Sequence, residues 1–158
     1  MDTLTQEGPR GLYFEEFEVG QTMVTRGRTV TEADIVQFAG LTGDYNPMHT
    51  DAEYCKTSFM GERVAHGMLV VSYAMGQVYQ LGIIEKTVLA FRGLEMKFSV
   101  PVTIGDTIRA ELEVKETKAA ARLGGGIVTV DMKIRNQDDK IVQKGTITLL
   151  VASQPEEE

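Results

Sequence analysis

The sequence predicts an α+β fold in which a curled antiparallel β-sheet wraps around one long, buried central α-helix. Residues 66–82 would place apolar side chains on every side of a helix, a pattern typical of a helix that is buried all round. Residues 107–115 and 128–134 alternate strictly between apolar and polar side chains, which indicates strands with one buried and one exposed face. Such half-exposed strands are typical of an antiparallel sheet. Because the helix directly precedes a meander of these strands, we expect the sheet to curl around it.

The chain is expected to fold as one domain. Its 158 residues are enough for a sizeable core, and a content of 42% hydrophobic and 25% charged residues is that of an ordinary globular protein. We place the domain at residues 12–152. Residues 1–11, which are broken by glycines and a proline, are expected to form a flexible N-terminal segment. Residues 153–158 are expected to form an acidic, solvated C-terminal tail.

The charge and the cysteine content restrict the possible partners. A net charge of −7 without a cluster of Lys or Arg argues against nucleic acid or an anionic membrane surface as a partner. Residues 67–84 are apolar but include Ser72, Gln77 and Gln80, so we interpret them as a buried helix and not as a membrane span. The single cysteine, Cys55, excludes an internal disulfide, and the first residues show no secretory signal, so we expect a cytoplasmic protein. Cys55 itself is interpreted as a small packed residue and not as a nucleophile.

The first half of the domain is expected to contain a strand and a capped helix. Residues 22–30 are predicted to form the strand. Thr31 is a typical N-cap and Gly43 a typical terminator of the helix between them. An irregular segment is expected from Asp44 onward, because Pro47 prevents a regular helix there. The buried stripe of the capped helix is predicted to consist of Ile35, Val36, Phe38, Ala39 and Leu41.

The second half is expected to supply the rest of the sheet. The strands are predicted at residues 87–99, 107–115, 128–134 and 141–152, with turns at 124–126 and 136–139. A curled sheet of this kind has edges that need to be covered, and pairing of two copies edge to edge is a simple solution. We therefore expect a homodimer or a dimer-based oligomer.

The most distinctive segment is Gly43-Asp44-Tyr45-Asn46-Pro47-Met48-His49. It contains one of only two histidines in the chain, and Asp44 and His49 lie five residues apart on a segment bent by Pro47. A neutral imidazole exchanges protons near pH 7, and a carboxylate can orient a water beside it. These two side chains therefore form a candidate acid–base pair. The alternative is structural, with Asp44 capping a turn and His49 packing at the surface.

The second histidine begins the segment His66-Gly67-Met68-Leu69, at the start of the predicted buried helix. The first backbone N–H groups of a helix are unpaired and carry partial positive charge, so the Gly67 N–H could stabilise the oxygen of an enolate. The alternative is that Gly67 only allows helix and sheet to approach closely. His66 could be a second acid–base group, but we interpret it as a structural residue at the helix start.

Other motifs do not predict a site. His49, Asp51 and Glu53 are metal-ligand residue types, but their alternate spacing at a helix start scatters the side chains, so no metal site is predicted. The three glycines at 124–126 precede a strand and lack a following Lys-Ser/Thr, so they are not a phosphate-binding loop. The chain has neither a Gly-x-Ser-x-Gly motif nor a dinucleotide-binding motif.

Taken together, the two histidine-containing segments resemble the MaoC-like dehydratases, the (R)-specific enoyl-CoA hydratases of the hotdog fold. Phe98-Ser99-Val100-Pro101-Val102, followed by Gly105-Asp106, matches the same family. The similarity covers about residues 12 to 152, which is nearly the whole chain. It implies the hotdog fold and the (R)-specific hydration of trans-2-enoyl-CoA thioesters, or the reverse dehydration.

The resemblance also implies roles for individual residues. The catalytic pair of the family falls on Asp44 and His49, the Gly67 N–H would hold the thioester oxygen, and Asn46 matches a position that supports the loop. No cofactor is implied, because CoA is part of the acyl-CoA substrate. The chain departs from some bacterial members, which carry a pocket-lining serine about nine residues after the motif histidine. Met75 stands at that position here, with Ser72 one turn earlier, so we expect these two residues to line the acyl pocket.

Two other functions remain as alternatives. A hotdog thioesterase usually requires a carboxylate on the buried helix, and residues 67–84 contain no Asp or Glu. A non-catalytic acyl-CoA-binding module would have no use for the pair Asp44 and His49. Crotonyl-CoA hydration and CoA release distinguish the three possibilities.

Overall fold

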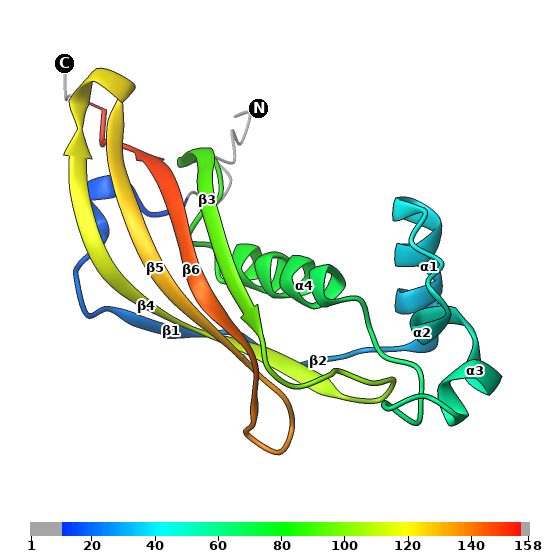
Figure 1. Ribbon diagram of the computed structural model, residues 1–158. Helices are drawn as coiled ribbons and strands as arrows, with labels where there is room; N and C mark the ends of the chain where they lie inside the picture. The colour runs from blue at the N-terminus through cyan, green and yellow to red at the C-terminus, as the bar shows by residue number, and fades with distance from the viewer. Residues whose placement is uncertain (1–10, 156–158) are drawn as a thin grey trace, which may run out of the picture.

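The computed structural model describes residues 11–155, which form one curled antiparallel sheet with helices at its inner face and beside it (Figure 1). The helices are η1 (Phe14–Glu16), α1 (Glu32–Thr42), α2 (Pro47–Thr50), α3 (Ala52–Lys56), α4 (Gly67–Gln80) and η2 (Ala121–Leu123). The strands are β1 (Thr22–Val24), β2 (Arg28–Thr29), β3 (Val88–Phe98), β4 (Thr107–Ala120), β5 (Gly125–Arg135) and β6 (Ile141–Ala152).

The sheet confirms the predicted antiparallel arrangement. Its order is β1-β4-β5-β6-β3, and β2 pairs separately with β4. Strands β4, β5 and β6 are a meander of long neighbours, whereas β3, which comes before them in the chain, pairs with β6 at the end of the sheet. Figure 1 shows these strands curving together, with α4 on their inner side and α1, α2 and α3 standing away from the sheet. The sheet is open and does not close into a barrel.

Helix α4 is the central helix that the sequence predicts, but it is not buried on every side. Leu69, Val70 and Ala74 are at most 1% exposed and belong to the core that α4 shares with the sheet. Met68 and Tyr79 are each 50% exposed. The prediction of burial all round is therefore wrong for the single chain, because one side of α4 faces away from the sheet.

The predicted strand at residues 22–30 is also wrong in its extent, because it is divided into β1 and β2. Between them, the Thr25 backbone N–H donates to the Ala110 carbonyl at 2.9 Å. The Thr25 hydroxyl oxygen in turn accepts from the Ala110 N–H at 2.9 Å. A side-chain oxygen thus replaces a backbone carbonyl in the ladder, so regular pairing with β4 stops at this point.

Helix α1 has the predicted ends but not the predicted stripe. Thr31 accepts from the Asp34 N–H as N-cap, and Gly43 ends the helix in the left-handed conformation at φ 79°. Ile35 and Ala39 are fully buried as expected. Val36 and Leu41 are 51% and 82% exposed, so their predicted burial is wrong, because α1 contacts the rest of the chain along only one narrow side.

The segment after Asp44 is more regular than predicted. Pro47 is the first residue of the one-turn helix α2, where its missing N–H costs nothing because that N–H would be unpaired anyway. The Asn46 side chain accepts from the Met48 N–H as N-cap. The predicted irregular segment is therefore wrong for residues 47–50, and His49 lies on a short helix.

The glycines at 124–126 form a turn only in part. Gly124 ends η2 at φ 78°, as a turn glycine does. Gly125 and Gly126 belong to β5, so the predicted turn is wrong for both. A Cβ on Gly125 would overlap the Val151 backbone, and one on Gly126 would overlap the Phe14 ring. These glycines are required for close packing and not for a turn.

The ends of the chain are described only in part. The predicted flexibility of residues 1–10 and the last three residues of the predicted acidic tail lie outside the described residues. Among the described residues, no helix is long and apolar enough to cross a membrane.

Candidate active site

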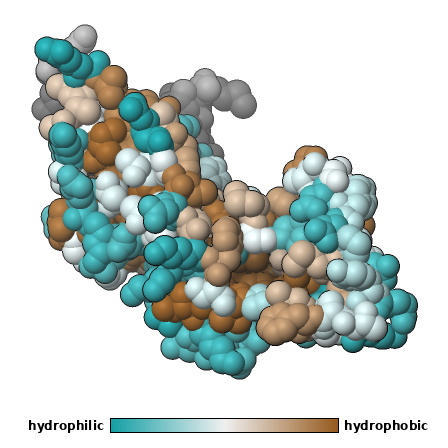
Figure 2. Space-filling view, in the orientation of Figure 1, coloured by the Kyte–Doolittle hydropathy of each residue, from teal (hydrophilic) through white to brown (hydrophobic). Residues whose placement is uncertain are grey.

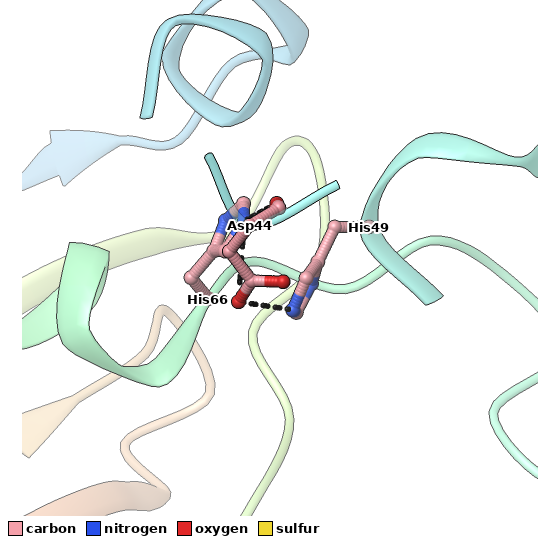
Figure 3. A group of neighbouring side chains, drawn as sticks. All are labelled: Asp44, His49 and His66. Atoms are coloured by element: carbon pink, nitrogen blue, oxygen red, sulfur yellow. Dashed lines mark hydrogen bonds and ion pairs between the residues drawn. The ribbon is translucent and has the colours of Figure 1, made fainter. Parts of the chain in front are cut away.

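Asp44, His49 and His66 come together where α1, α2 and α4 meet (Figure 3). Asp44 follows the C-terminus of α1, His49 lies on α2, and His66 is the N-cap residue of α4. Asp44 and His66 are 22 positions apart in the sequence, yet the fold brings both histidines of the protein to the Asp44 carboxylate. The predicted pair is close in space, and the second histidine belongs to the same cluster.

The carboxylate of Asp44 is held by the local turn while one oxygen stays available. Its Oδ1 accepts from the Asn46 N–H at 3.2 Å, as an Asx turn does. Its Oδ2 lies 3.9 Å from His49 Nε2 and 4.0 Å from His66 Nε2. The Asp44 side chain is 52% exposed, whereas His49 and His66 are buried. Asp44 is therefore the member of the cluster that solvent or a ligand reaches directly.

The His49 ring has a defined orientation and tautomer. Its Nδ1 is 2.7 Å from the Val64 carbonyl oxygen. Because a carbonyl can only accept, Nδ1 carries the hydrogen in the neutral ring, and Nε2 presents a lone pair. This lone pair faces the Asp44 carboxylate, so His49 has the arrangement that a general base requires.

His66 contacts both members of the pair. Its Nε2–H donates to the Asp44 carbonyl at 2.9 Å, and its ring stacks on the His49 ring with centroids 3.7 Å apart and an interplanar angle of 25°. Phe38 covers the ring at a centroid distance of 4.9 Å. The structural role of His66 is therefore to hold the Asp44 backbone and the His49 ring together.

The gap between Asp44 Oδ2 and His49 Nε2 suits a water molecule. Two acceptors 3.9 Å apart can each accept one hydrogen of the same water at about 2.8 Å, which leaves the lone pairs of that water pointing outward. A metal ion fits the three side chains less well. An imidazole binds a metal in the plane of its ring, and one ion cannot lie in the planes of two stacked rings at once.

Gly67 lies beside this cluster at the first position of α4 and lines a cavity of about 330 Å³. Most of the cavity wall is apolar and comes from three parts of the chain, represented by Met48, Val70 and Phe98. Asp44 and His49 are not part of the wall. The wall does include Met48, which precedes His49 in the sequence, and Val64, whose carbonyl accepts from the His49 ring. Figure 2 shows apolar surface in the lower middle of the molecule, between the sheet and the helices α1 to α3.

A polar contact joins α1 to α4 behind the cluster. The Tyr73 hydroxyl on α4 donates to Asp34 Oδ1 on α1 at 2.7 Å, and the Arg28 guanidinium lies 3.7 Å from the centre of the Tyr73 ring. Burial and then the hydrogen bond to Asp34 raise the pKa of Tyr73 to about 12. This contact fixes the helix that precedes Asp44 relative to the helix that begins at Gly67.

Residues 15–136 match the model of the family described as MaoC like domain. The chain belongs to this family. Protein MaoC of Klebsiella aerogenes is 43% identical over 104 residues, which are 65% of this chain. The (R)-specific enoyl-CoA hydratase of Rhodospirillum rubrum is 36% identical over 107 residues, 65% of this chain and 69% of that protein.

The MaoC-like chain spans only 30% of the length of the Klebsiella protein. The fold of the chain described here is the hotdog fold. A Mycobacterium tuberculosis protein with a double hotdog fold superposes with a TM-score of 0.79 at 23% identity, covering 94% of this chain and 46% of that one. This structural likeness concerns the fold alone, and it agrees with the curled sheet and central helix described above.

In this MaoC-like domain the two predicted pocket residues lie apart from the cluster. Met75 lines a separate cavity of about 20 Å³ inside the core, together with Phe17 and Met23. The Ser72 hydroxyl donates to the Met68 carbonyl at 2.7 Å on an exposed side of α4. Neither residue is part of the wall of the cavity beside Gly67.

Cys55 is fully buried in the MaoC-like domain, as its interpretation as a packed residue requires. Its Sγ lies 3.5 Å from the carbonyl oxygens of Pro47 and Met48. The thiol therefore packs against the backbone of α2, the helix that carries His49.

Gln143 is a residue of the site that no sequence motif marks. It lines the cavity and donates from Nε2 to the Gly67 carbonyl at 2.9 Å. The available signal was a polar residue beside Val142 in a strand that is otherwise apolar at its buried positions. Its contact depends on how β6 meets α4, which the sequence pattern does not predict.

Proposed function

We propose that this protein hydrates trans-2-enoyl-CoA thioesters to (R)-3-hydroxyacyl-CoA, or catalyses the reverse dehydration of (R)-3-hydroxyacyl-CoA. The observation that supports this most is the gap of 3.9 Å between Asp44 Oδ2 and His49 Nε2, with His49 oriented by the Val64 carbonyl. The (R)-specific hydratase among the relatives supports the reaction and its stereochemistry.

In the proposed hydration, Asp44 and His49 share the reacting water. The water donates one hydrogen to each acceptor, and its oxygen attacks C3 of the enoyl group. His49 Nε2 takes one proton as the new C3–O bond forms, and the electron pair of the C2=C3 bond moves toward the thioester carbonyl. The proton then passes from Nε2 to C2, so that one water is added and the enzyme returns to its starting state.

Gly67 would stabilise the intermediate. The negative charge that develops during the attack resides on the thioester oxygen, and a backbone N–H at a helix N-terminus stabilises such an oxygen. Among residues 11–155, the Gly67 N–H has no acceptor outside α4 itself. We propose Asn46 as the residue that supports the loop, because it caps α2 and donates its own N–H to Asp44.

The proposed reaction needs no cofactor, because CoA is part of the substrate and both proton transfers use side chains of the cluster. We also propose that the protein acts as a homodimer in the cytoplasm. The apolar side chains exposed on the edge strand β3 support dimerisation, and the single, buried Cys55 suits a reducing compartment.

The experiment that tests this function uses crotonyl-CoA. Hydration is followed as loss of the enoyl absorbance, free CoA is measured in the same samples, and the product is analysed by chiral chromatography. We expect (R)-3-hydroxybutyryl-CoA without release of CoA. Release of CoA without loss of the double bond would instead identify a thioesterase.

Binding without any turnover, across enoyl-CoA chains of several lengths, would identify an acyl-CoA-binding module. The name of the Klebsiella relative specifies no reaction, so this outcome has to be tested directly.

A further inference from the structure

Gln143 is a polar residue in an apolar row of the sheet. Residues that face each other across antiparallel strands share one side of the sheet, and Gln143 on β6 faces Phe98 on β3 and Ile134 on β5. Ile134 in turn faces Ala110 on β4, and both are fully buried. Gln143 is 3% exposed, so its amide is buried at a position where the neighbouring strands carry apolar side chains.

The amide of Gln143 reaches the first residue of α4. Its Nε2–H donates to the Gly67 carbonyl at 2.9 Å, across 76 residues of sequence. This carbonyl belongs to the first peptide unit of the helix, whose other end is the Met68 N–H. The hydrogen bond therefore fixes the plane of that unit and the backbone angle ψ of Gly67, the residue type with the greatest conformational freedom.

Phe98 fixes the same residue from another direction. A Cβ on Gly67 would lie 2.9 Å from Cε1 of the Phe98 ring, so the ring packs directly against the Gly67 Cα. Phe98 and Gln143 are register partners on neighbouring strands. One row of the sheet thus holds Gly67 by an apolar contact and by a hydrogen bond.

The remaining atom of the amide shows that this arrangement is not optimised for stability. Gln143 Oε1 is buried and has no hydrogen-bond partner among the described residues. Leaving a buried acceptor unpaired costs about 1–3 kcal/mol, whereas an apolar side chain of similar shape would avoid this cost. Core packing alone therefore does not explain the amide at this position, and its one partner is the Gly67 carbonyl.

We propose that Gln143 is a positioning residue. Together with Phe98 it holds Gly67 from its carbonyl side, so that the preceding peptide unit, which carries the Gly67 N–H, keeps that N–H directed at the thioester oxygen. This inference rests on the proposed function, because it assumes that Gly67 binds that oxygen. It adds a residue on β6, 76 positions after Gly67, to a site whose proposed reacting groups all lie within residues 44–67.

The test compares Gln143→Met with Gln77→Met. Gln77 is a matched control: it is also buried, donates from Nε2 to the backbone carbonyls of Arg26 and Ile108, and leaves its Oε1 unpaired. It lies ten residues after Gly67 on α4, about 15 Å along the helix axis. Both substitutions remove one buried amide, so a general loss of stability affects both variants.

We expect Gln143→Met to lower kcat for crotonyl-CoA hydration about tenfold with little change in KM, because only the transition state carries the full charge on oxygen. Gln77→Met should keep kcat within about twofold of wild type per folded molecule. Equal kcat values for the two variants would overturn the proposal. If Gln143→Met does not fold, Gln143→Asn serves instead, because its shorter side chain does not reach Gly67.

A second measurement distinguishes this inference from the proposed function. Butyryl-CoA with a 13C-labelled thioester carbonyl binds without a double bond to hydrate, and infrared difference spectroscopy reports how strongly its oxygen is polarised. We expect wild type and Gln77→Met to lower the carbonyl stretching frequency, and Gln143→Met to lower it less. A shift that persists in wild type without crotonyl-CoA hydration would contradict the proposed function alone. Identical shifts in all three proteins would overturn the role of Gln143.

Discussion

His66 fixes the positions of Asp44 and His49 relative to each other. Its ring donates to the backbone of Asp44 and stacks on His49, while it is itself 4% exposed. Nδ1 of His66 has no partner among the described residues, so this ring, like Gln143, is kept at a cost in hydrogen bonding. The geometry of the pair is therefore set by a buried side chain that a ligand does not need to touch.

Replacing either member of the pair should remove most of the activity. Asp44→Asn and His49→Gln are each expected to lower kcat by about 10²–10⁴-fold, because the water loses one of its two acceptors. Circular dichroism should show an unchanged fold, since Asp44 is half exposed and the His49 variant keeps an amide near Val64. Crotonyl-CoA turnover within a factor of ten of wild type in either variant would contradict the assigned roles.

Gly67 should be replaceable only if its neighbour becomes smaller. Gly67→Ala places a Cβ against the Phe98 ring and is expected to lower kcat about 10²-fold by displacing the first turn of α4. In a Phe98→Leu background the same substitution should lose much less, because the contact is relieved. Steady-state kinetics of both single variants and the double variant give this coupling directly, and simple additivity of the two losses would argue against it.

At the level of the elements, glycines mark the places where strands and helices approach most closely. Gly145→Ala on β6 should destabilise the protein by about 3 kcal/mol or more, because its Cβ would overlap the Glu95 backbone on β3. Gly76→Ala on α4 meets nothing within 4 Å and should stabilise by about 0.5–1 kcal/mol through the better helix propensity of Ala. Urea denaturation of the two variants provides the comparison, and equal effects would show that the backbone at Gly145 can move.

The contact between α1 and α4 should make stability depend on alkaline pH. Tyr73 binds its proton more tightly in the folded protein, where its pKa is raised from 10.0 to about 12 by burial and by Asp34. Its contribution is therefore complete below pH 10 and is lost as the pH rises toward 12. Tyr73→Phe should lower the free energy of unfolding by about 1 kcal/mol at neutral pH.

The measurement is urea unfolding of wild type and Tyr73→Phe on both sides of pH 10. We expect the difference between the two proteins to shrink above that pH, because the unfolded wild type gains stability by releasing the Tyr73 proton. A difference that stays constant across this range would show that the hydroxyl is not held by Asp34.

The elements also show which parts of the fold the sequence could predict. The start of the central helix at Gly67, the antiparallel arrangement of the strands after it and both ends of α1 follow from periodicity and capping, and the structure confirms them. The strand predicted at 107–115 is longer and continues to Ala120. The prediction ended too early because a register shift between Val114 and Glu116 interrupts the alternation of apolar and polar side chains. The exposure of Leu41 was not predictable from the sequence. An apolar side of a helix indicates that the side is buried, but it does not show which part of the chain would cover it.

The candidate site was predictable only where it is contiguous in sequence. Asp44 and His49 are carried by one short segment, and Gly67 is marked by its place at a helix start. Gln143 and Phe98 act on Gly67 through the pairing of β3 with β6, and a single sequence does not contain that register. The stacking of His66 on His49 likewise depends on how α2 meets α4.

For the whole molecule, the arrangement of the sheet predicts an assembly of two chains. Strand β3 is at one end of the sheet, and Leu89, Phe91 and Leu94 on it are 40–51% exposed. We expect sedimentation equilibrium to give about twice the chain mass of 17.4 kDa. Phe91→Lys should shift the protein toward monomer, whereas Leu123→Lys, a similarly exposed apolar residue on η2, should not. A monomeric wild type would contradict the proposed dimer.

The separation of α1, α2 and α3 from the sheet has a consequence for how the protein loses activity. Residues 31–66 carry Asp44, His49 and His66. Apart from Ile35 and Ala65 in the core and the contact of Asp34 with Tyr73, they attach to the rest through a few backbone contacts, such as the Ala65 N–H to the Val102 carbonyl at 2.7 Å. Segments with few such contacts open at lower free energy than the core. Heat or denaturant will therefore abolish activity by unfolding this segment while the sheet is still folded. The loss of turnover will then measure the stability of the segment and not the stability of the whole domain.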